Sequence, residues 1–227
     1  MAHKHINYSR IVLAGLIILM ITSCSRTGFR GTIEYNLTYP GSRIDYATQE
    51  ALPSSVEIIS NNNLLKKQYK GGGELGQVQI TDSDEETVNI LLEIMGNRYH
   101  IIRTRNEIMA ATLEMPEPKL EFTGETKEIM GYVCQKVHAI TYDDFGNETV
   151  SEIYFTSEID GKPFNFDTPY RDIPGLMLIY ELRVGDVNMR YEVERIRTRR
   201  RGTGRRNFKI PRGYQTTTYE ELRRELE

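Results

Sequence analysis

The sequence is poor in the residues that most often carry metal and redox chemistry. Its 227 residues include two cysteines, four histidines and no tryptophan. Cys24 ends an apolar N-terminal segment and is assigned a different role below. Cys134 is therefore left without a disulfide partner. CxxC redox chemistry and zinc binding are therefore not supported, and the two histidines beyond that segment, His100 and His138, are too few for a metal site. We expect no metal and no cofactor.

A strong net charge is also missing, because the formal charge is only −3. Nothing global therefore suggests nucleic acid, and we expect no nucleic-acid partner. Gly71-Gly72-Gly73 lacks the GxxxxGK[ST] frame of a phosphate loop. No Ser/His/Asp order or metal cluster stands out, so we predict that the protein is not an enzyme and has no catalytic residues.

Long hydrophobic runs are limited to one, at residues 11–21. The run is too short to span a bilayer, which takes about 20 residues. Lys4 and Arg10 precede it, and no acidic residue does. This combination predicts a secretory signal rather than a transmembrane helix.

The signal ends in Ile21-Thr22-Ser23-Cys24, which resembles a bacterial lipobox. We therefore predict signal cleavage between Ser23 and Cys24 and lipid attachment at Cys24, with an ordinary secretory signal as the alternative. The next residue is Ser25 rather than aspartate, which favours the outer membrane of a Gram-negative-type bacterium, facing the periplasm.

Three parts follow from this interpretation. Residues 1–23 are a lipoprotein signal peptide, residues 24–30 a lipidated tether, and residues 31–227 a single domain, which is long enough for one core. The Thr218-Tyr219-Glu220-Glu221 sequence is a capping box that predicts a C-terminal helix at 218–227.

Alternation of apolar and polar residues predicts β-strands through most of this domain. In residues 32–39, Ile33, Tyr35 and Leu37 share one face. Prolines predict that residues 115–118 leave the sheet, and residues 42–54 read as a loop or short helix. Further strands are predicted at 56–60, 64–70, 78–81, 87–95, 98–103, 108–113, 131–142, 148–155, 176–184 and 187–197, with a last short one ending at Ile210.

The fold class is therefore mainly β, a curled antiparallel meander of nine to eleven strands with helices only at its margins. A sheet of this size must curl or close. Its concave apolar face is then filled by the protein's own helices, by a second sheet or by a ligand.

Three ordered segments resemble a known group of proteins. They are KEIMGYVCQK at residues 127–136, IPGLML at residues 173–178 and FKIPRGY at residues 208–214, and the GTIEY sequence at residues 31–35 fits the start. They resemble segments of uncharacterised secreted and lipoprotein domains that are similar to the LolA-like lipoprotein-carrier superfamily.

The resemblance implies a half-barrel with a helical lid over an apolar cavity that binds a lipid or another hydrophobic ligand. It implies no catalytic residues. The predicted cavity-lining side chains are Ile33, Tyr35, Leu37, Tyr191 and Val193, with plain core packing as the alternative. Lipoprotein carriers shuttle as soluble proteins, whereas an anchor at Cys24 would hold this chain at the membrane.

An arginine-rich stretch near the C-terminus is the sharpest local charge feature. It contains Arg195, Arg197, Arg199, Arg200, Arg201, Arg205 and Arg206. We predict that Arg199, Arg200 and Arg201 contact anionic lipid headgroups, and a solvated hairpin tip is the alternative.

Two functions stay open from the sequence. The first is a lipid-anchored envelope protein that binds a lipid or other hydrophobic ligand. The second is a non-enzymatic structural or interaction module of the cell envelope, with a self-packed core and an envelope protein as partner. A hollow concave face would favour the ligand-binding protein, and a filled concave face would favour the structural or interaction module.

Overall fold

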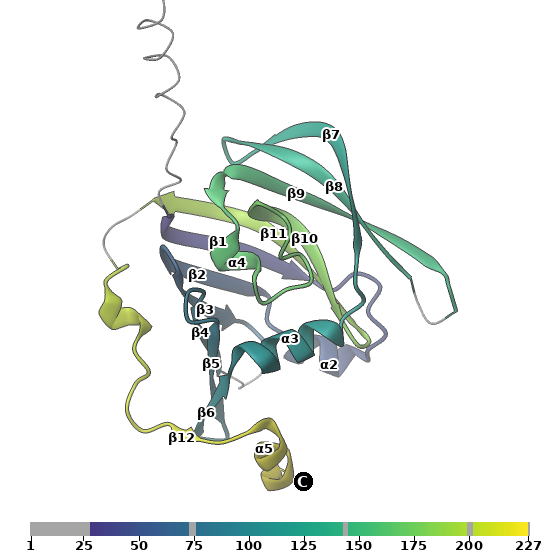
Figure 1. Ribbon diagram of the computed structural model, residues 1–227. Helices are drawn as coiled ribbons and strands as arrows, with labels where there is room; N and C mark the ends of the chain where they lie inside the picture. The colour runs from purple at the N-terminus through teal and green to yellow at the C-terminus, as the bar shows by residue number, and fades with distance from the viewer. Residues whose placement is uncertain (1–27, 73–75, 143–144, 199–201, 227) are drawn as a thin grey trace, which may run out of the picture.

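The computed structural model describes residues 28–72, 76–142, 145–198 and 202–226. The predicted signal peptide, the lipid-attachment residue Cys24 and Arg199, Arg200 and Arg201 lie outside the described residues. Within the described part, twelve strands form one mostly antiparallel sheet that is not closed into a barrel, and helices are few (Figure 1). The prediction of a mainly β, curled meander is confirmed.

The elements follow the chain in two runs of strands separated by a helix. The strands are β1 (Arg30–Thr38), β2 (Ser55–Asn61), β3 (Leu64–Lys70), β4 (Gly76–Asp82), β5 (Thr87–Ile94), β6 (Asn97–Arg103), β7 (Lys119–Ile129), β8 (Tyr132–Tyr142), β9 (Glu148–Asp160), β10 (Gly175–Val184), β11 (Val187–Thr198) and β12 (Gln215–Thr216). The helices are α2 (Tyr46–Ala51), α3 (Arg105–Leu113), α4 (Lys162–Asn165), the 3-10 turn η1 (Arg205–Phe208) and α5 (Tyr219–Leu226). Among the helices of these residues, none has the length and apolarity to cross a membrane.

Strand β1 lies inside the sheet and joins its two halves. The order is β12-β6-β5-β4-β3-β2-β1-β11-β10-β9-β8-β7, so β2–β6 run outward on one side of β1 and β7–β11 return to its other side. The antiparallel pairing of β1 with β11 connects residues about 160 positions apart, for example Glu34 with Arg195. Strand β12 pairs with β6 in parallel.

Local turn chemistry explains two of the hairpins. Met95-Gly96 joins β5 to β6, and Met130-Gly131 joins β7 to β8. All four residues have positive φ, between 51° and 82°. Two-residue loops of this kind match the right-handed twist of the strands, and glycine adopts the second position without strain.

The main core lies on the concave face of the sheet. Side chains from β1, β2 and β8–β11 pack there against the chain that connects β9 to β10. This connection carries α4 and contributes Phe164, Tyr170 and Ile173, which are all buried. Figure 1 shows α4 in front of β1, β10 and β11 and α3 across the lower part of the opening.

Helix α3 is a correction to the sequence prediction of a strand at residues 108–113. Thr104 and Glu107 form a capping box, in which the Thr104 amide donates to the Glu107 carboxylate at 2.7 Å. Ile108 then packs on β5 and β6 of the same concave face. The capping signal at Thr104 decides the structure, because it satisfies amides that a helix would otherwise leave unpaired.

Two further sequence predictions differ from the structure. Strand β7 is not among the predicted strands, although it is eleven residues long. The predicted last strand ending at Ile210 is also wrong, because η1 precedes this position and β12 follows it. Phe208 of η1 instead packs with Ile80 and Leu91 on the convex face.

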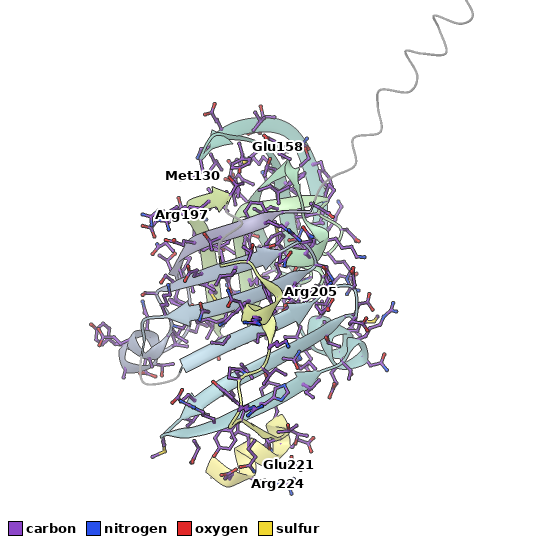
Figure 2. All side chains as sticks on the ribbon, turned by 90° about the vertical axis from the view of Figure 1, so that its left-hand side faces the viewer. Met130, Glu158, Arg197, Arg205, Glu221 and Arg224 are labelled. Carbon is purple, nitrogen blue, oxygen red and sulfur yellow. The ribbon has the colours of Figure 1, made fainter. Side chains whose placement is uncertain are left out.

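The predicted C-terminal helix is present as α5. The Thr218 amide donates to the Glu221 carboxylate at 3.0 Å, and the Glu221 amide donates to the Thr218 hydroxyl at 3.2 Å. Leu222 is buried against the α3 and β6 cluster. The chain thus ends on the β5–β6 half of the molecule, where Figure 2 labels Glu221 and Arg224.

Candidate functional site

Two polar side chains interrupt an apolar row on the concave face. In the sequence of β3, Lys67 lies two residues from Leu65 and from Tyr69, so alternation places it on the inner face. The strand register pairs Lys67 with Ile58 on one side and with Gln79 on the other. Across the sheet the row is Ile33, Ile58, Lys67, Gln79, Ile90 and Ile101.

Lys67 forms an ion pair with Asp167 of the β9–β10 connection. Its Nζ lies 3.0 Å from Oδ2 and 3.3 Å from Oδ1 of Asp167. The two side chains are 12% and 13% exposed. Burial by itself lowers the pKa of Lys67, but the Asp167 carboxylate and Tyr69 outweigh it, and the pKa is raised. Lys67 therefore stays charged at neutral pH.

Four tyrosines lie beside this ion pair. Tyr180 and Tyr191 stack with ring centroids 4.5 Å apart, and Tyr35 meets both rings edge-on at 6.0 Å. The Tyr35 hydroxyl donates to the Met177 carbonyl at 2.7 Å. Burial raises the pKa of all four, Tyr69 included. Their hydroxyls thus stay protonated and remain hydrogen-bond donors.

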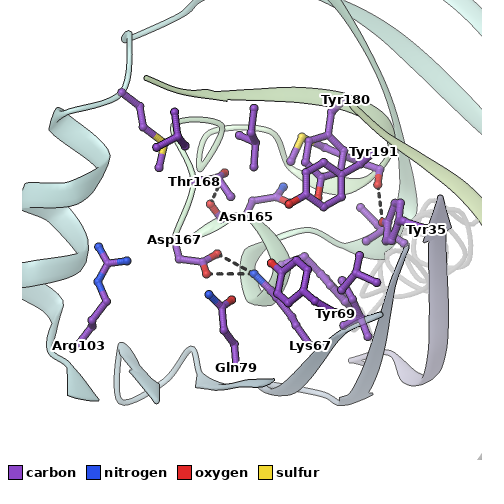
Figure 3. A pocket seen from close by; sticks show the side chains of 18 residues that line it. Tyr35, Lys67, Tyr69, Gln79, Arg103, Asn165, Asp167, Thr168, Tyr180 and Tyr191 are labelled. Carbon is purple, nitrogen blue, oxygen red and sulfur yellow. Dashed lines mark hydrogen bonds and ion pairs between the residues drawn. The ribbon is translucent and has the colours of Figure 1, made fainter. Parts of the chain in front are cut away.

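These groups line a cavity of about 190 Å³, which we call the inner cavity. Figure 3 shows Lys67, Tyr69 and Gln79 rising from the sheet toward Asp167 and Asn165 of the β9–β10 connection. Its lining residues are Tyr35, Val56, Ile58, Lys67, Tyr69, Gln79, Arg103, Met115, Phe164, Asn165, Asp167, Thr168, Leu176, Met177, Tyr180, Leu182, Val184 and Tyr191.

Asn165 fixes the β9–β10 connection over the inner cavity. Its side-chain amide donates to the carbonyls of Ile173 at 2.9 Å and Gly175 at 3.0 Å. Its side-chain oxygen, in contrast, is buried and has no hydrogen-bond partner among the described residues. A buried acceptor without a partner is unfavourable, and no water-sized group reaches this oxygen through the cavity.

A second hollow lies between α3 and β7. This α3 groove has a volume of about 660 Å³. Apolar side chains are unusually exposed in it: Leu113 is 77% exposed, Phe122 56% and Met109 41%. Met115 lines both the groove and the inner cavity. The groove is lined by Met109, Thr112, Leu113, Met115, Glu117, Pro118, Leu120, Phe122, Pro169, Arg171 and Asp172.

The structure separates the predicted ligand-lining residues into two groups. Tyr35 and Tyr191 line the inner cavity. Ile33, Leu37 and Val193 are buried in the main core and line neither hollow. Sequence reasoning missed Lys67 and Asp167, and the one available signal was a lysine at an inward position of a strand.

The arginine-rich stretch is partly neutralised where it is described. Arg195 and Arg197 lie 3.2 Å and 3.5 Å from the Glu34 carboxylate on the neighbouring strand. Figure 2 shows Arg197 at the end of β11 and Arg205 on the segment that crosses the convex face. The predicted headgroup contacts Arg199, Arg200 and Arg201 fall outside the described residues.

Cys134 is a fully buried side chain, and burial raises the pKa of its thiol to about 11. The reactive thiolate is therefore scarce at neutral pH. We expect the folded protein with Cys24 occupied by lipid or replaced by serine to resist maleimide labelling at pH 7 and to label fully in denaturant. Mass spectrometry of the adduct measures this, and rapid labelling of the folded chain would contradict a core role.

The described ranges contain no group of three or more His, Cys, Asp or Glu side chains placed to hold a metal ion.

No family model matches the chain, and no curated protein matches it. A solved structure of PNGF-II in the C2 space group aligns with a TM-score of 0.48 and 16% identity, over 86% of this chain and 31% of that chain. This chain thus spans about a third of PNGF-II, and a likeness of this degree establishes neither a shared fold nor a shared function.

Proposed function

We propose that this chain is a lipid-anchored envelope protein that holds a lipid or another hydrophobic ligand in the α3 groove. The observation that carries the proposal is the exposure of Leu113, Phe122 and Met109 in a hollow of about 660 Å³. Pockets for small molecules commonly measure about 300–1,000 Å³ and are mostly apolar. The groove has a suitable size and lining.

Burial of the exposed side chains supplies the driving force. Removing apolar surface from water contributes roughly 25 cal/mol for each Å². Phe122 projects from the inner face of β7, where its ring meets the buried Phe155 edge-on at 6.0 Å. An acyl chain beside Phe122 and Leu113 would therefore extend the existing core rather than start a new one.

We expect Phe122→Ser and Leu113→Ser each to weaken binding of a fluorescent fatty-acid probe about tenfold, because burying such a side chain contributes about 1.5–3 kcal/mol. Probe titration of residues 25–227 measures the affinity. Phe145→Ser is the matched control, because Phe145 is 91% exposed and lies outside the groove lining.

A direct search for a native ligand complements the titration. Organic extraction of the purified protein followed by mass spectrometry should recover a lipid. An empty extract together with no probe binding would refute the proposed function.

The anchor is part of the same proposal and has its own test. In this proposal a lipid at Cys24 holds the domain at the membrane, and Arg199, Arg200 and Arg201 are the expected contacts of anionic headgroups. Intact-mass measurement of chain isolated from membranes should give a protein that begins at Cys24 and carries acyl groups. An unmodified Cys24 would refute the anchor and leave the groove proposal standing.

The alternative is an envelope interaction module without a ligand. The observation in its favour is that α4 and the residues after it fill the centre of the concave face with Phe164, Tyr170 and Ile173. In this alternative, the exposed groove side chains contact an envelope protein. If the extracted native lipid displaces the fluorescent probe, the ligand-binding function is favoured over the interaction module.

A further inference from the structure

The inner cavity differs from the α3 groove in its chemistry. Its wall brings a charged pair, amides and phenols together with the apolar side chains of Val56, Ile58, Leu176 and Met177. A cavity that served only packing would gain nothing from Lys67 and Asp167, because apolar residues of similar volume often replace a buried ion pair without loss of stability. The polar groups therefore need another explanation.

Several of these polar groups lack partners of their own. The buried Asn165 side-chain oxygen accepts no hydrogen bond from any described residue. Within the same described part of the chain, neither the Tyr180 hydroxyl nor the Gln79 side-chain amide has a hydrogen bond to another side chain or to the backbone. Lys67 uses its contacts with Asp167 and still has capacity to donate, because an ammonium carries three protons.

The pattern of donors and acceptors selects the ligand. Lys67 can only donate, and the Tyr180 hydroxyl and the Gln79 amide can both donate and accept. A hydroxyl group is the ligand group that satisfies all of them, because it donates one hydrogen bond and accepts two. Several hydroxyls around an apolar carbon skeleton would match the mixed wall.

The compensated charges of the wall and the volume of the cavity narrow the class of ligand further. Lys67 and Asp167 already balance each other, so a charged ligand would disturb a compensated pair. Arg103 lies apart from this pair in Figure 3, and its guanidinium donates to the Glu107 carbonyl at 3.2 Å. A volume of about 190 Å³ far exceeds the roughly 10–15 Å³ that one water needs, yet it is below that of a drug-sized pocket.

We propose that the inner cavity is a second binding site, for a small, neutral, hydroxyl-rich molecule such as a polyol or a single sugar ring. The site is separate from the α3 groove and does not depend on the function proposed for it. Its principal contacts are Lys67, Gln79, Asp167 and Tyr180.

The test uses the purified protein without sugar-based detergents, because these would compete for the site. Saturation-transfer NMR and calorimetry with glycerol, glucose and myo-inositol should detect millimolar or tighter binding of at least one of them. Tyr180→Phe and Gln79→Leu should each weaken it about three- to tenfold, the effect of one lost hydrogen bond. Tyr142→Phe is the matched control, because its hydroxyl contacts Glu148 on the exposed β8–β9 hairpin.

Each of the following results would overturn the proposal. If none of the three probes binds, the cavity holds water only. If the two cavity variants bind like the wild type, the probes occupy another site. Tighter binding of gluconate than of glucose would exclude the preference for a neutral ligand, and displacement of the fatty-acid probe by glucose would show that the two hollows are one site.

Discussion

Replacing Asp167 with alanine is expected to lower the free energy of unfolding by about 3 kcal/mol. The substitution leaves the Lys67 ammonium inside the inner cavity without its counter-ion. Lys67 is 12% exposed, so water compensates only part of the loss, and the expected change is at the low end of the range for buried pairs. Urea denaturation followed by circular dichroism measures the change.

The same reasoning predicts a reversal and a pH effect. The double variant Lys67→Met/Asp167→Leu should recover most of the lost stability, because no charge stays unpaired. In Asp167→Ala, burial is left to lower the pKa of Lys67, so this variant should regain stability as pH rises and the lysine loses its proton.

Glu121→Ala is the control for the stability measurement on Asp167→Ala. It removes an exposed pair with Lys119 and should leave the free energy of unfolding nearly unchanged. Equal effects of the two single variants would show that burial of the pair is irrelevant.

Most of the hairpins could be predicted from the sequence, but the pairing that joins the two halves of the sheet could not. Turn residues such as Gly96 and Gly185 mark where neighbouring strands reverse, which is a local property. The pairing of β1 with β11 joins distant segments, and neither strand differs visibly from the others in its alternation. The central position of β1 therefore needed the structure.

The two missed elements have different physical reasons. In α3, Ile108-Met109-Ala110-Ala111 has no clear helical period, and the capping box at Thr104 was the stronger signal. Strand β7 is an edge strand whose side chains are mostly exposed on both faces, so its sequence carries little alternation. Its apolar residues Leu120 and Phe122 line the open groove and touch only the margin of the main core.

The inner cavity was out of reach of sequence reasoning because its two halves come from different layers. Lys67 lies on the sheet, and Asp167 lies 100 residues later in the connection that covers it. The alternation in β3 places Lys67 inward, but only the position of α4 shows that a carboxylate faces it. Asn165 ties that connection to Gly175, so the cavity roof depends on how β10 begins.

Replacing Gly175 with alanine is accordingly expected to destabilise the protein by at least about 3 kcal/mol, at the upper end for overpacking. A Cβ at this position would lie 2.1 Å from the Thr156 carbonyl oxygen and 2.7 Å from the ring of Phe155. Thr156 and Phe155 are buried in β9, and the register between β9 and β10 shifts at this point. The nearest atoms belong to the Thr156 backbone, so no side-chain rotation relieves the contact.

The matched control is Gly204→Ala. Gly204 has a φ of −66°, and a Cβ added to it would meet no atom within 4 Å, so its change should stay within about 0.5 kcal/mol. Thermal and urea unfolding of both variants provide the comparison. If Gly175→Ala were as stable as Gly204→Ala, the close contact of β9 with β10 would not be required, and the roof of the inner cavity would have to be held by Asn165 and the Lys67–Asp167 pair alone.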